Sequence, residues 1–386
     1  MALDTETLNQ LLDTVGRFVE QRLRPLEQRV AEEDRIPDEV IQEMRDLGLF
    51  GLSIPEEFGG LGLTMSEEVQ VAFRLGRTSP AFRSLIGTNN GIGSQGIVID
   101  GTDEQKAHYL PKLAAGELIG SFCLTEPNSG SDAGSLRTSA RRDGTDFILN
   151  GTKRYITNAP QAGVFTVFAR TEPDSRDARG VTAFVVDATL PGISLGPVDK
   201  KMGQKGAHTC DVIFEDVRVP ESAIIGGPAR LNQGFKTAMK VLDRGRLHIG
   251  AVCCGVSERL IEDALRYAMD RKQFGQPIAE FQLIQAMLAD SKAESYAARC
   301  MVEETARRKE AGVNVSTEAA CCKMFATEMV GRVADRAVQI HGGAGYIADY
   351  DVERFYRDVR LFRIYEGTTQ IQQLVIARNM IREAQA

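Results

Sequence analysis

The first 118 residues carry an apolar pattern with the period of an α-helix. Apolar side chains recur there at intervals of three and four residues, which places them on one face of each helix. The clearest run contains Leu12, Val15, Phe18, Val19 and Leu23. Pro37, a residue well suited to the first turn of a helix, precedes a second periodic run. Residues 1–118 are therefore predicted to form an N-terminal α-helical domain.

The pattern changes near residue 119, where helical spacing gives way to short apolar runs. Residues 164–168, 181–186 and 211–214 are rich in β-branched and aromatic side chains and have the length of strands. The dipeptide Asn150-Gly151 predicts a hairpin turn, because both residues readily adopt positive φ. We expect residues 119–230 to form a small β domain, built as a barrel or a sandwich.

Helical spacing returns at about residue 231, in segments longer than those at the N-terminus. The longest are residues 234–270, 281–311 and 316–340. A further helix follows Thr368, and four helices are enough for an antiparallel bundle. The expected fold is α+β and mainly α. Its three domains are an N-terminal α-helical domain at 1–118, a middle β domain at 119–230 and a C-terminal four-helix bundle at 231–386.

Composition and charge exclude several classes of function. The net charge of −7 argues against a nucleic-acid partner. No run of about 18 apolar residues is present, so no membrane-spanning helix is expected. The acidic start lacks both the basic and the apolar segment of a signal peptide. The seven cysteines include no C-x-x-C pair, which favours reduced thiols and a cytoplasmic protein.

Metal and hydrolase chemistry also lack their sequence signals. The four histidines do not pair at metal-ligand spacing, and no H-E-x-x-H sequence occurs. The G-x-S-x-G sequence of serine hydrolases is absent as well. Neither a metal site nor a Ser-His-Asp triad is therefore expected.

The strongest candidate for catalysis is Glu366, which stands between Tyr365 and Gly367 near the C-terminus. Its apolar neighbours Ile364 and Tyr365 would raise the pKa of a buried carboxylate, as a general base at neutral pH requires. Gly367 would let a ligand approach the backbone closely. A loop before a last helix could have the same four residues, so other segments have to decide between the two interpretations.

Four further segments accompany the run 363–371 that contains Glu366. They are residues 122–132 (FCLTEPNSGSD), 155–158 (YITN), 271–275 (RKQFG) and 339–346 (QIHGGAGY). In this order, the five segments closely resemble the acyl-CoA dehydrogenase family of flavoenzymes, from about residue 10 to the end of the chain. The resemblance implies the same three-domain fold, FAD as cofactor, a homotetramer, and α,β-dehydrogenation of an acyl-CoA thioester in fatty-acid β-oxidation.

The loop 125–131 offers backbone N–H groups and hydroxyls that could hydrogen-bond a flavin, although a surface loop can have the same composition. No G-x-G-x-x-G sequence follows a strand, so a Rossmann site is not expected. The resemblance implies FAD contacts for Phe122, Leu124, Thr125, Gly130, Ser131, Tyr155, Ile156, Thr157, Thr368 and Gln370. It implies contacts with a neighbouring subunit's FAD for Arg271, Phe274, Gln282, Gln339, Gly342 and Gly343. Many members of the family have tryptophan at the position of Tyr155.

The resemblance also implies how the substrate is held and oxidised. Asp243 and Arg246 match positions that bind CoA, and Ser131 and Gly367 are further expected substrate contacts. Glu366 would take the α-proton while the β-hydride passes to flavin N5, and the Glu366 backbone N–H would help to hold the enolate oxygen. Some branches of the family place the base at the position of Gly245, so Glu366 is the candidate base here. Electron transfer flavoprotein is the expected acceptor.

Arg83 raises an alternative substrate class. The segment Phe82-Arg83-Ser84 aligns with a stretch of glutaryl-CoA dehydrogenases whose arginine binds the distal carboxylate of the substrate. The chain would then be a decarboxylating dehydrogenase or a desulfinase of an ω-anionic acyl-CoA. Arg83 could instead pair with a protein carboxylate or point to solvent, and Gly87 replaces a serine of that subfamily. An apolar helix over 92–99 is expected to line the acyl pocket.

Two other activities of the same fold remain as alternatives. Relatives of nitroalkane oxidase use aspartate as the base, and Glu366 counts against that activity. A DNA-associated flavoprotein of the alkylation-response type would need a basic C-terminal domain. Residues 231–386 are nearly balanced in charge, which disfavours it.

Overall fold

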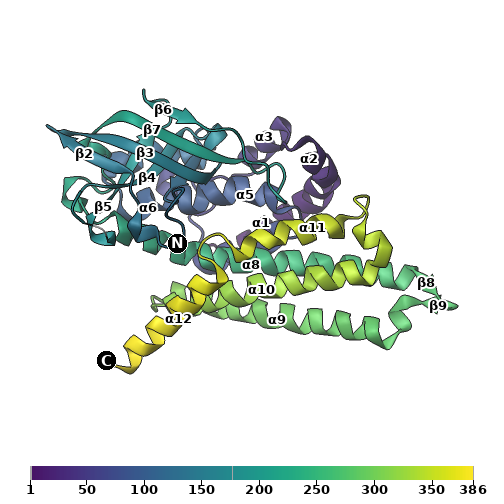
Figure 1. The fold of residues 1–386 in the computed structure, drawn as a ribbon. Helices are drawn as coiled ribbons and strands as arrows, with labels where there is room; N and C mark the ends of the chain where they lie inside the picture. The colour runs from purple at the N-terminus through teal and green to yellow at the C-terminus, as the bar shows by residue number, and fades with distance from the viewer. Residues whose placement is uncertain (1, 176, 386) are drawn as a thin grey trace.

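Short helices form the N-terminal part of the chain, drawn in purple and blue in Figure 1. The computed structural model describes residues 2–175 and 177–385. The helices are α1 (Thr5–Phe18), α2 (Glu27–Glu33), α3 (Asp38–Asp46), α4 (Met65–Leu75), α5 (Pro80–Thr88), α6 (Gln95–Asp100) and α7 (Asp103–Ala114). Capping boxes begin α4 and α7, in which Thr64 pairs with Glu67 and Thr102 with Gln105. The predicted apolar face of the first run is buried along α1 and the π-helical turn that follows it.

The helix expected over 92–99 is interrupted. A π-helical turn covers Asn89–Gly93, where Gly91 leaves helical φ/ψ, and α6 begins only at Gln95. The apolar residues of this segment favour a helix, but its glycines weaken one by about 1 kcal/mol each relative to alanine.

The middle of the chain forms a curled sheet. Its strands are β1 (Gly120–Cys123), β2 (Ser139–Asp143), β3 (Asp146–Thr157), β4 (Val164–Arg170), β5 (Val181–Asp187), β6 (Ile193–Leu195) and β7 (Thr209–Pro220). The strand order is β1-β4-β2-β3-β7-β6, and β5 pairs with the β4 strand. The β2 and β4 strands pair through Ser139 and Arg170. Phenylalanines from β3, β4, β5 and β7 fill its core.

The hairpin turn predicted at Asn150-Gly151 is wrong. These residues lie inside β3, at a shift of register against the β7 strand. Asn150 exchanges hydrogen bonds with Asp216 across the two strands, at 2.9 Å each, so the segment is a β-bulge. The turn between β2 and β3 lies instead at Gly144, whose φ is +64°. The Asp-Gly pair at 143–144 carries the same turn signal.

The C-terminal part is dominated by long helices. They are α8 (Gly234–Asp270), α9 (Gln282–Glu310) and α10 (Ser316–His341), followed by α11 (Asp351–Val359) and α12 (Thr369–Ala384). The first three pack along one another, and α12 packs on α10. A small hairpin of β8 (Lys272–Gln273) and β9 (Gln276–Pro277) forms the tip of the bundle, whereas α12 projects from the opposite end (Figure 1). None of the helices within 2–175 and 177–385 combines the length and apolarity needed to cross a membrane.

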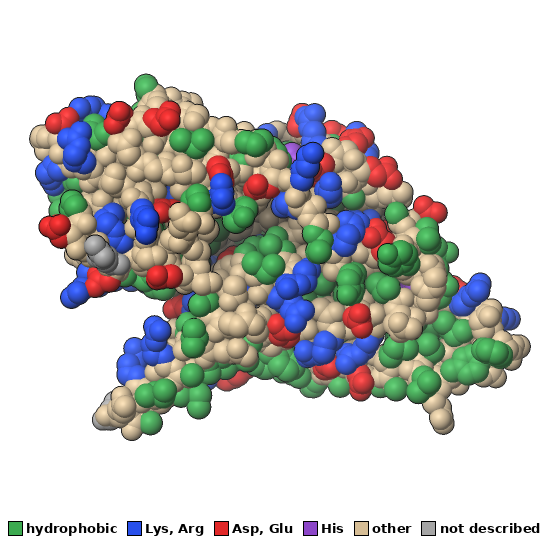
Figure 2. Space-filling model, in the orientation of Figure 1, with side chains coloured by type: hydrophobic (Ala, Val, Ile, Leu, Met, Phe, Trp, Pro, Cys, Tyr) green, Lys and Arg blue, Asp and Glu red, His purple; other side chains and the backbone are tan. Residues whose placement is uncertain are grey.

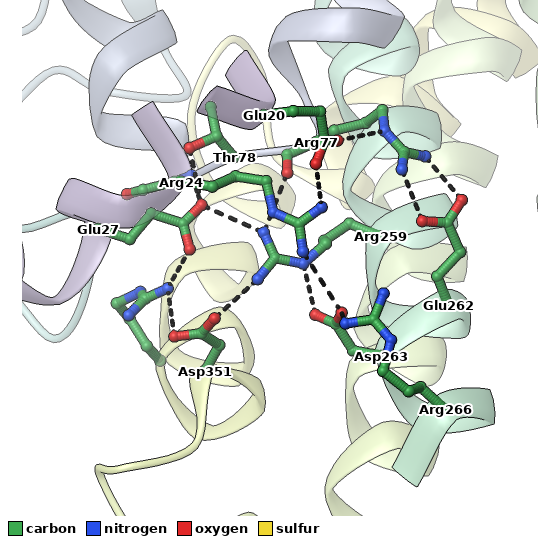
Figure 3. A network of polar contacts seen from close by, with 12 residues as sticks. Glu20, Arg24, Glu27, Arg77, Thr78, Arg259, Glu262, Asp263, Arg266 and Asp351 are labelled. Atoms are coloured by element: carbon green, nitrogen blue, oxygen red, sulfur yellow. Dashed lines mark hydrogen bonds and ion pairs between the residues drawn. The ribbon is translucent and has the colours of Figure 1, made fainter. Parts of the chain in front are cut away.

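A buried ionic network joins the N-terminal helices to the bundle (Figure 3). Glu27 of α2 is 1% exposed and accepts hydrogen bonds from the Thr78 hydroxyl at 2.7 Å and the Ser79 N–H at 2.9 Å. Arg354 of α11 donates to Glu27 at 2.6 Å, and Arg259 of α8 lies 3.4 Å from it. Because removing one member of a buried ion pair leaves the other uncompensated, we expect the loss of any one of these side chains to destabilise the contact of α2 with α8 and α11.

Candidate active site

A cavity of about 610 Å³ lies where the N-terminal helices, the sheet and the bundle meet. Figure 2 shows the surface hollowed between the β domain and the helices below it. Its walls come from α5, from β1 and the loop after it, from β3, from the first turns of α8, and from residues 365–378. The sequence-predicted site residues that line it are Arg83, Phe122, Leu124, Thr125, Gly130, Ser131, Tyr155, Ile156, Thr157, Arg246, Glu366 and Gly367.

Glu366 occupies a strained loop before α12. Its φ is +51°, in the left-handed region, and Gly367 follows with φ +89°. The Oε2 atom is buried and has no hydrogen-bond partner in the part of the chain that the structure describes. Burial raises the pKa of this carboxyl, and the charges of Arg83, Lys323 and Arg246 act against the rise. An unpaired carboxylate in a cavity is available to accept a proton from a ligand.

Gly245 makes room for this carboxylate. A Cβ atom at Gly245 would lie 2.1 Å from Glu366 Oε2, closer than side-chain carbons approach oxygen. The absence of a side chain at this point of α8 therefore gives the Glu366 carboxylate its space.

Lys323 was not predicted from the sequence and supports the same loop. It stands on α10 with no exposed surface, and its Nζ donates to the Gly367 carbonyl at 2.6 Å. Gln372 donates to the Glu366 and Gly367 carbonyls at 3.1 Å each. Burial lowers the pKa of Lys323 to about 8, although Glu366 opposes the change. The available signal was a lysine on an otherwise apolar helix face.

Arg83 lies on α5, is 5% exposed, and also lines the cavity. Its Nε donates to His248 Nε2 at 2.9 Å. No Asp or Glu among residues 2–175 and 177–385 comes within ion-pair distance of its guanidinium. The structure supports neither of the two structural roles considered for Arg83, pairing with a protein carboxylate and exposure to solvent.

The opposite wall combines apolar and hydroxyl side chains. Phe122 and Leu124 present apolar surface, and the cavity edge carries Thr125 and Ser131. The loop 125–131 is held to the sheet, because Arg154 N–H donates to the Thr125 carbonyl at 2.8 Å. The adjacent Glu126 pairs with the fully buried Lys153 at 2.8 Å and accepts from the Thr138 N–H. This anchoring distinguishes the loop from an ordinary surface loop.

Tyr155 stands beside this loop at a second bulge of β3. The register against β7 shifts between Lys153 and Ile156, and Tyr155 adopts a φ of +58°. Its side chain is 64% exposed and lies on the cavity wall. A broad aromatic surface next to hydroxyls and free backbone groups suits a planar ring that has both faces and polar edges, as an isoalloxazine has.

The pair Asp243 and Arg246 lies on α8. Arg246 is 6% exposed and donates to Asp243 at 2.5 Å. Arg246 lines the cavity, and its charge acts on Glu366, whereas Asp243 is not among the lining residues. The pair is therefore not a solvated helical charge pair.

The remaining predicted residues lie outside this cavity. Arg271 lines a separate cavity of about 530 Å³ near the tip of the bundle, and Phe274 is 94% exposed. The other distal residues are Gln282, Gln339, Gly342 and Gly343. Thr368 caps α12 by accepting from the Ile371 N–H at 3.2 Å, and Gln370 is exposed. One chain alone therefore does not unite all the predicted FAD contacts.

All three parts of the chain match known protein domains. Its sequence matches the acyl-CoA dehydrogenase N-terminal domain over residues 5–117, the middle domain over 121–217 and the C-terminal domain over 232–381. The chain belongs to the acyl-CoA dehydrogenase family. The predicted fold class is thereby confirmed, and so is the prediction of an oxidoreductase that uses FAD.

Two relatives of this acyl-CoA dehydrogenase-family chain are named as reductases. Acryloyl-CoA reductase (NADH) of Anaerotignum propionicum is 41% identical, over 98% of this chain and 95% of that protein. The caffeyl-CoA reductase-Etf complex subunit CarC of Acetobacterium woodii is 38% identical, over 97% of this chain and 98% of that protein.

Solved structures of the family agree closely with this fold. Butyryl-CoA dehydrogenase from Megasphaera elsdenii has a TM-score of 0.93 at 33% identity, covering 99% of this chain and 100% of that one. An acyl-CoA dehydrogenase from Bacillus anthracis complexed with FAD has a TM-score of 0.92 at 34% identity, covering 99% of this chain and 68% of that one.

Proposed function

We propose that the chain dehydrogenates an acyl-CoA thioester to the trans-2-enoyl-CoA, with Glu366 as the base that removes the α-proton. The observation that carries the proposal is the Glu366 carboxylate, whose Oε2 is buried and unpaired in the described structure beside a cavity large enough for a ligand. Burial favours the neutral form of the Glu366 carboxyl and so raises its pKa toward the range of a general base at neutral pH.

Each wall of the cavity has a role in this proposal. Bound FAD supplies the acceptor for the β-hydride, and Leu124, Thr125, Ser131, Tyr155 and Thr157 are the residues that would hold its ring. Arg246, kept in place by Asp243, would bind the CoA portion through its guanidinium. The Glu366 N–H has no acceptor among the described residues, so it is free to donate to the thioester oxygen as negative charge develops there.

The proposal is tested by Glu366→Gln, which is nearly isosteric but cannot take a proton. We expect the variant to retain FAD and to bind acyl-CoA, while reduction of the flavin by butyryl-CoA slows by several orders of magnitude. Stopped-flow absorbance of the flavin band, without oxygen, measures the rate. A wild-type rate in the variant would refute the role of Glu366.

We further propose electron transfer flavoprotein as the acceptor and a homotetramer as the active form. The name of the CarC relative refers to an Etf complex. Phe274, Leu283 and Tyr346, at the distal end of the bundle, are 81–94% exposed, which suits burial against another subunit. Light scattering would measure the mass in solution, and oxidation of the reduced enzyme by added electron transfer flavoprotein would test the partner. A monomer that binds FAD fully would contradict the tetramer.

A second candidate is an enzyme for an ω-anionic acyl-CoA, a decarboxylating dehydrogenase or a desulfinase. The specific observation is Arg83, whose buried guanidinium has no carboxylate partner in the described parts of the chain. We expect glutaryl-CoA to exceed butyryl-CoA in kcat/KM, and Arg83→Ala to reverse the order by removing a charge-assisted contact of roughly 1.5–3 kcal/mol. A wild-type preference for butyryl-CoA would reject this candidate.

A further inference from the structure

Arg83 is the end of a buried chain of polar groups that crosses three helices. Its Nε donates to His248 Nε2 on α8 at 2.9 Å. His248 Nδ1 lies 2.8 Å from Glu68 Oε1 on α4, and the other oxygen of Glu68 pairs with Arg244. Arg83, His248 and Glu68 are each at most 6% exposed.

The contacts determine the protonation state of His248. An arginine carries only donors, so His248 Nε2 has to accept and carries no proton. The imidazole proton is then on Nδ1, where it donates to the Glu68 carboxylate. Burial by itself would raise the pKa of Glu68. The charge of Arg244 and the hydrogen bond from His248 outweigh this effect and lower the pKa to about 2, so Glu68 stays ionised.

This arrangement holds Arg83 without neutralising it. The charge of Glu68 is matched by Arg244, with which it forms an ion pair, whereas Arg83 meets a neutral imidazole. Gly87 leaves the space that the side chain needs, because a Cβ atom there would lie 2.6 Å from Arg83 Nε. The Nη atoms of Arg83 donate to no described residue, and the side chain lines the cavity that holds Glu366.

We propose that His248 and Glu68 are positioning residues, which orient Arg83 so that its unpaired guanidinium edge selects an acyl chain ending in a carboxylate or sulfinate. This inference rests on the proposed function, because it assumes that the acyl chain enters the cavity beside Glu366. The charge of Arg83 acts on Glu366, but the two groups do not form an ion pair, so a ligand anion would supply the partner that a buried arginine needs.

The test compares His248→Leu with His248→Gln. Leucine has a similar volume and cannot accept from Arg83, whereas the glutamine Oε1 can reach the place of Nε2. The measured quantity is the ratio of kcat/KM for glutaryl-CoA to that for butyryl-CoA, with FAD content and melting temperature as folding controls. We expect the wild type to favour glutaryl-CoA, His248→Leu to lose about tenfold or more of that ratio, and His248→Gln to recover most of it.

A pH profile gives a second readout that a merely structural role would not change. Protonated His248 would present an N–H to the Arg83 N–H, so the glutaryl-CoA preference of the wild type should fall once the pH is low enough to protonate His248. The groups facing His248 are Arg83, Glu68 and Arg244, and burial lowers the pKa of His248, so the fall should lie below about 6.5, the ordinary pKa of histidine. His248→Gln should show no such fall.

The outcomes separate this inference from the proposed function. Flavin reduction by butyryl-CoA and glutaryl-CoA at equal efficiency in the wild type would overturn the inference and leave the dehydrogenase proposal standing. An unchanged ratio in well-folded His248→Leu would overturn it as well, and so would a pH-independent ratio in the wild type. Absence of flavin reduction by any thioester would instead refute the proposed function.

Discussion

Gly245→Ala tests the position of the proposed catalytic carboxylate, Glu366, with a single methyl group. The new Cβ atom would lie 2.1 Å from Glu366 Oε2, and carbon–oxygen contacts in proteins are not found below about 3 Å. The carboxylate must therefore retreat by about 1 Å, and a displacement of that size typically costs about 10²-fold in rate. The obstructed atom is the end of a flexible side chain, so folding should tolerate the change. At an interior helix position, alanine is also more favourable than glycine by about 1 kcal/mol.

We accordingly expect Gly245→Ala to lose about 10²-fold in the rate of flavin reduction while keeping FAD and a melting temperature at or above that of the wild type. The assay is anaerobic stopped flow with a saturating acyl-CoA, so that the chemical step is separated from binding. Gly331→Ala is the matched control, because Gly331 lies inside α10 and a Cβ atom there would have no neighbour closer than 3.8 Å. Wild-type reduction rates in Gly245→Ala would show that the reacting carboxylate does not lie where the structure places it.

Two further predictions concern buried charges. Lys323→Met should move the acid limb of the kcat/KM–pH profile to higher pH, because the ammonium that favours ionised Glu366 is lost; a limb that stays in place would contradict this electrostatic role. Glu68→Gln should destabilise the fold by about 3–5 kcal/mol at pH 7, measured by urea unfolding, because Arg244 loses its counter-ion. The pKa of Glu68 is about 2 in the folded state and near 4.5 in the unfolded state, so the Glu68 charge makes its full contribution to folding stability above about pH 4.5. The difference between the two proteins should therefore shrink as the pH falls from about 4.5 toward 2, and a constant difference would argue against it.

The features predicted correctly from the sequence are those that depend on local spacing. The helix expected over 234–270 begins and ends at those residues, because its period is uninterrupted and its end meets Arg271 in an extended conformation. Strands over 164–168 and 181–186 were found for the same reason. The turn at Asn150-Gly151 failed because pairing with β7 continues through the dipeptide, and only tertiary context distinguishes a bulge from a turn there.

The same distinction between local pattern and tertiary contact applies to the residues of the site. Glu366 could be proposed from its neighbours and from the family's ordered segments, and the structure places it in the cavity wall. Lys323, His248 and Glu68 were missed, because each is an ordinary helical residue until packing brings it to its partner. His248 and Glu68 are 180 positions apart in the chain, and Lys323 meets Gly367 across 44 positions. No local pattern contains such a contact.

The ionic network around Glu27 also has a consequence for how the chain is made. Its partner Arg354 lies 327 positions further along, so nine-tenths of the chain must leave the ribosome before the pair can form. Until then Glu27 has its hydrogen bonds from Thr78 and Ser79 but lacks the guanidinium of Arg354. We therefore expect this contact between α2 and α11 to be among the last to form when the chain is synthesised. A chain truncated before Arg354 would keep Arg259 as a cationic partner of the Glu27 carboxylate but would lose the nearer one.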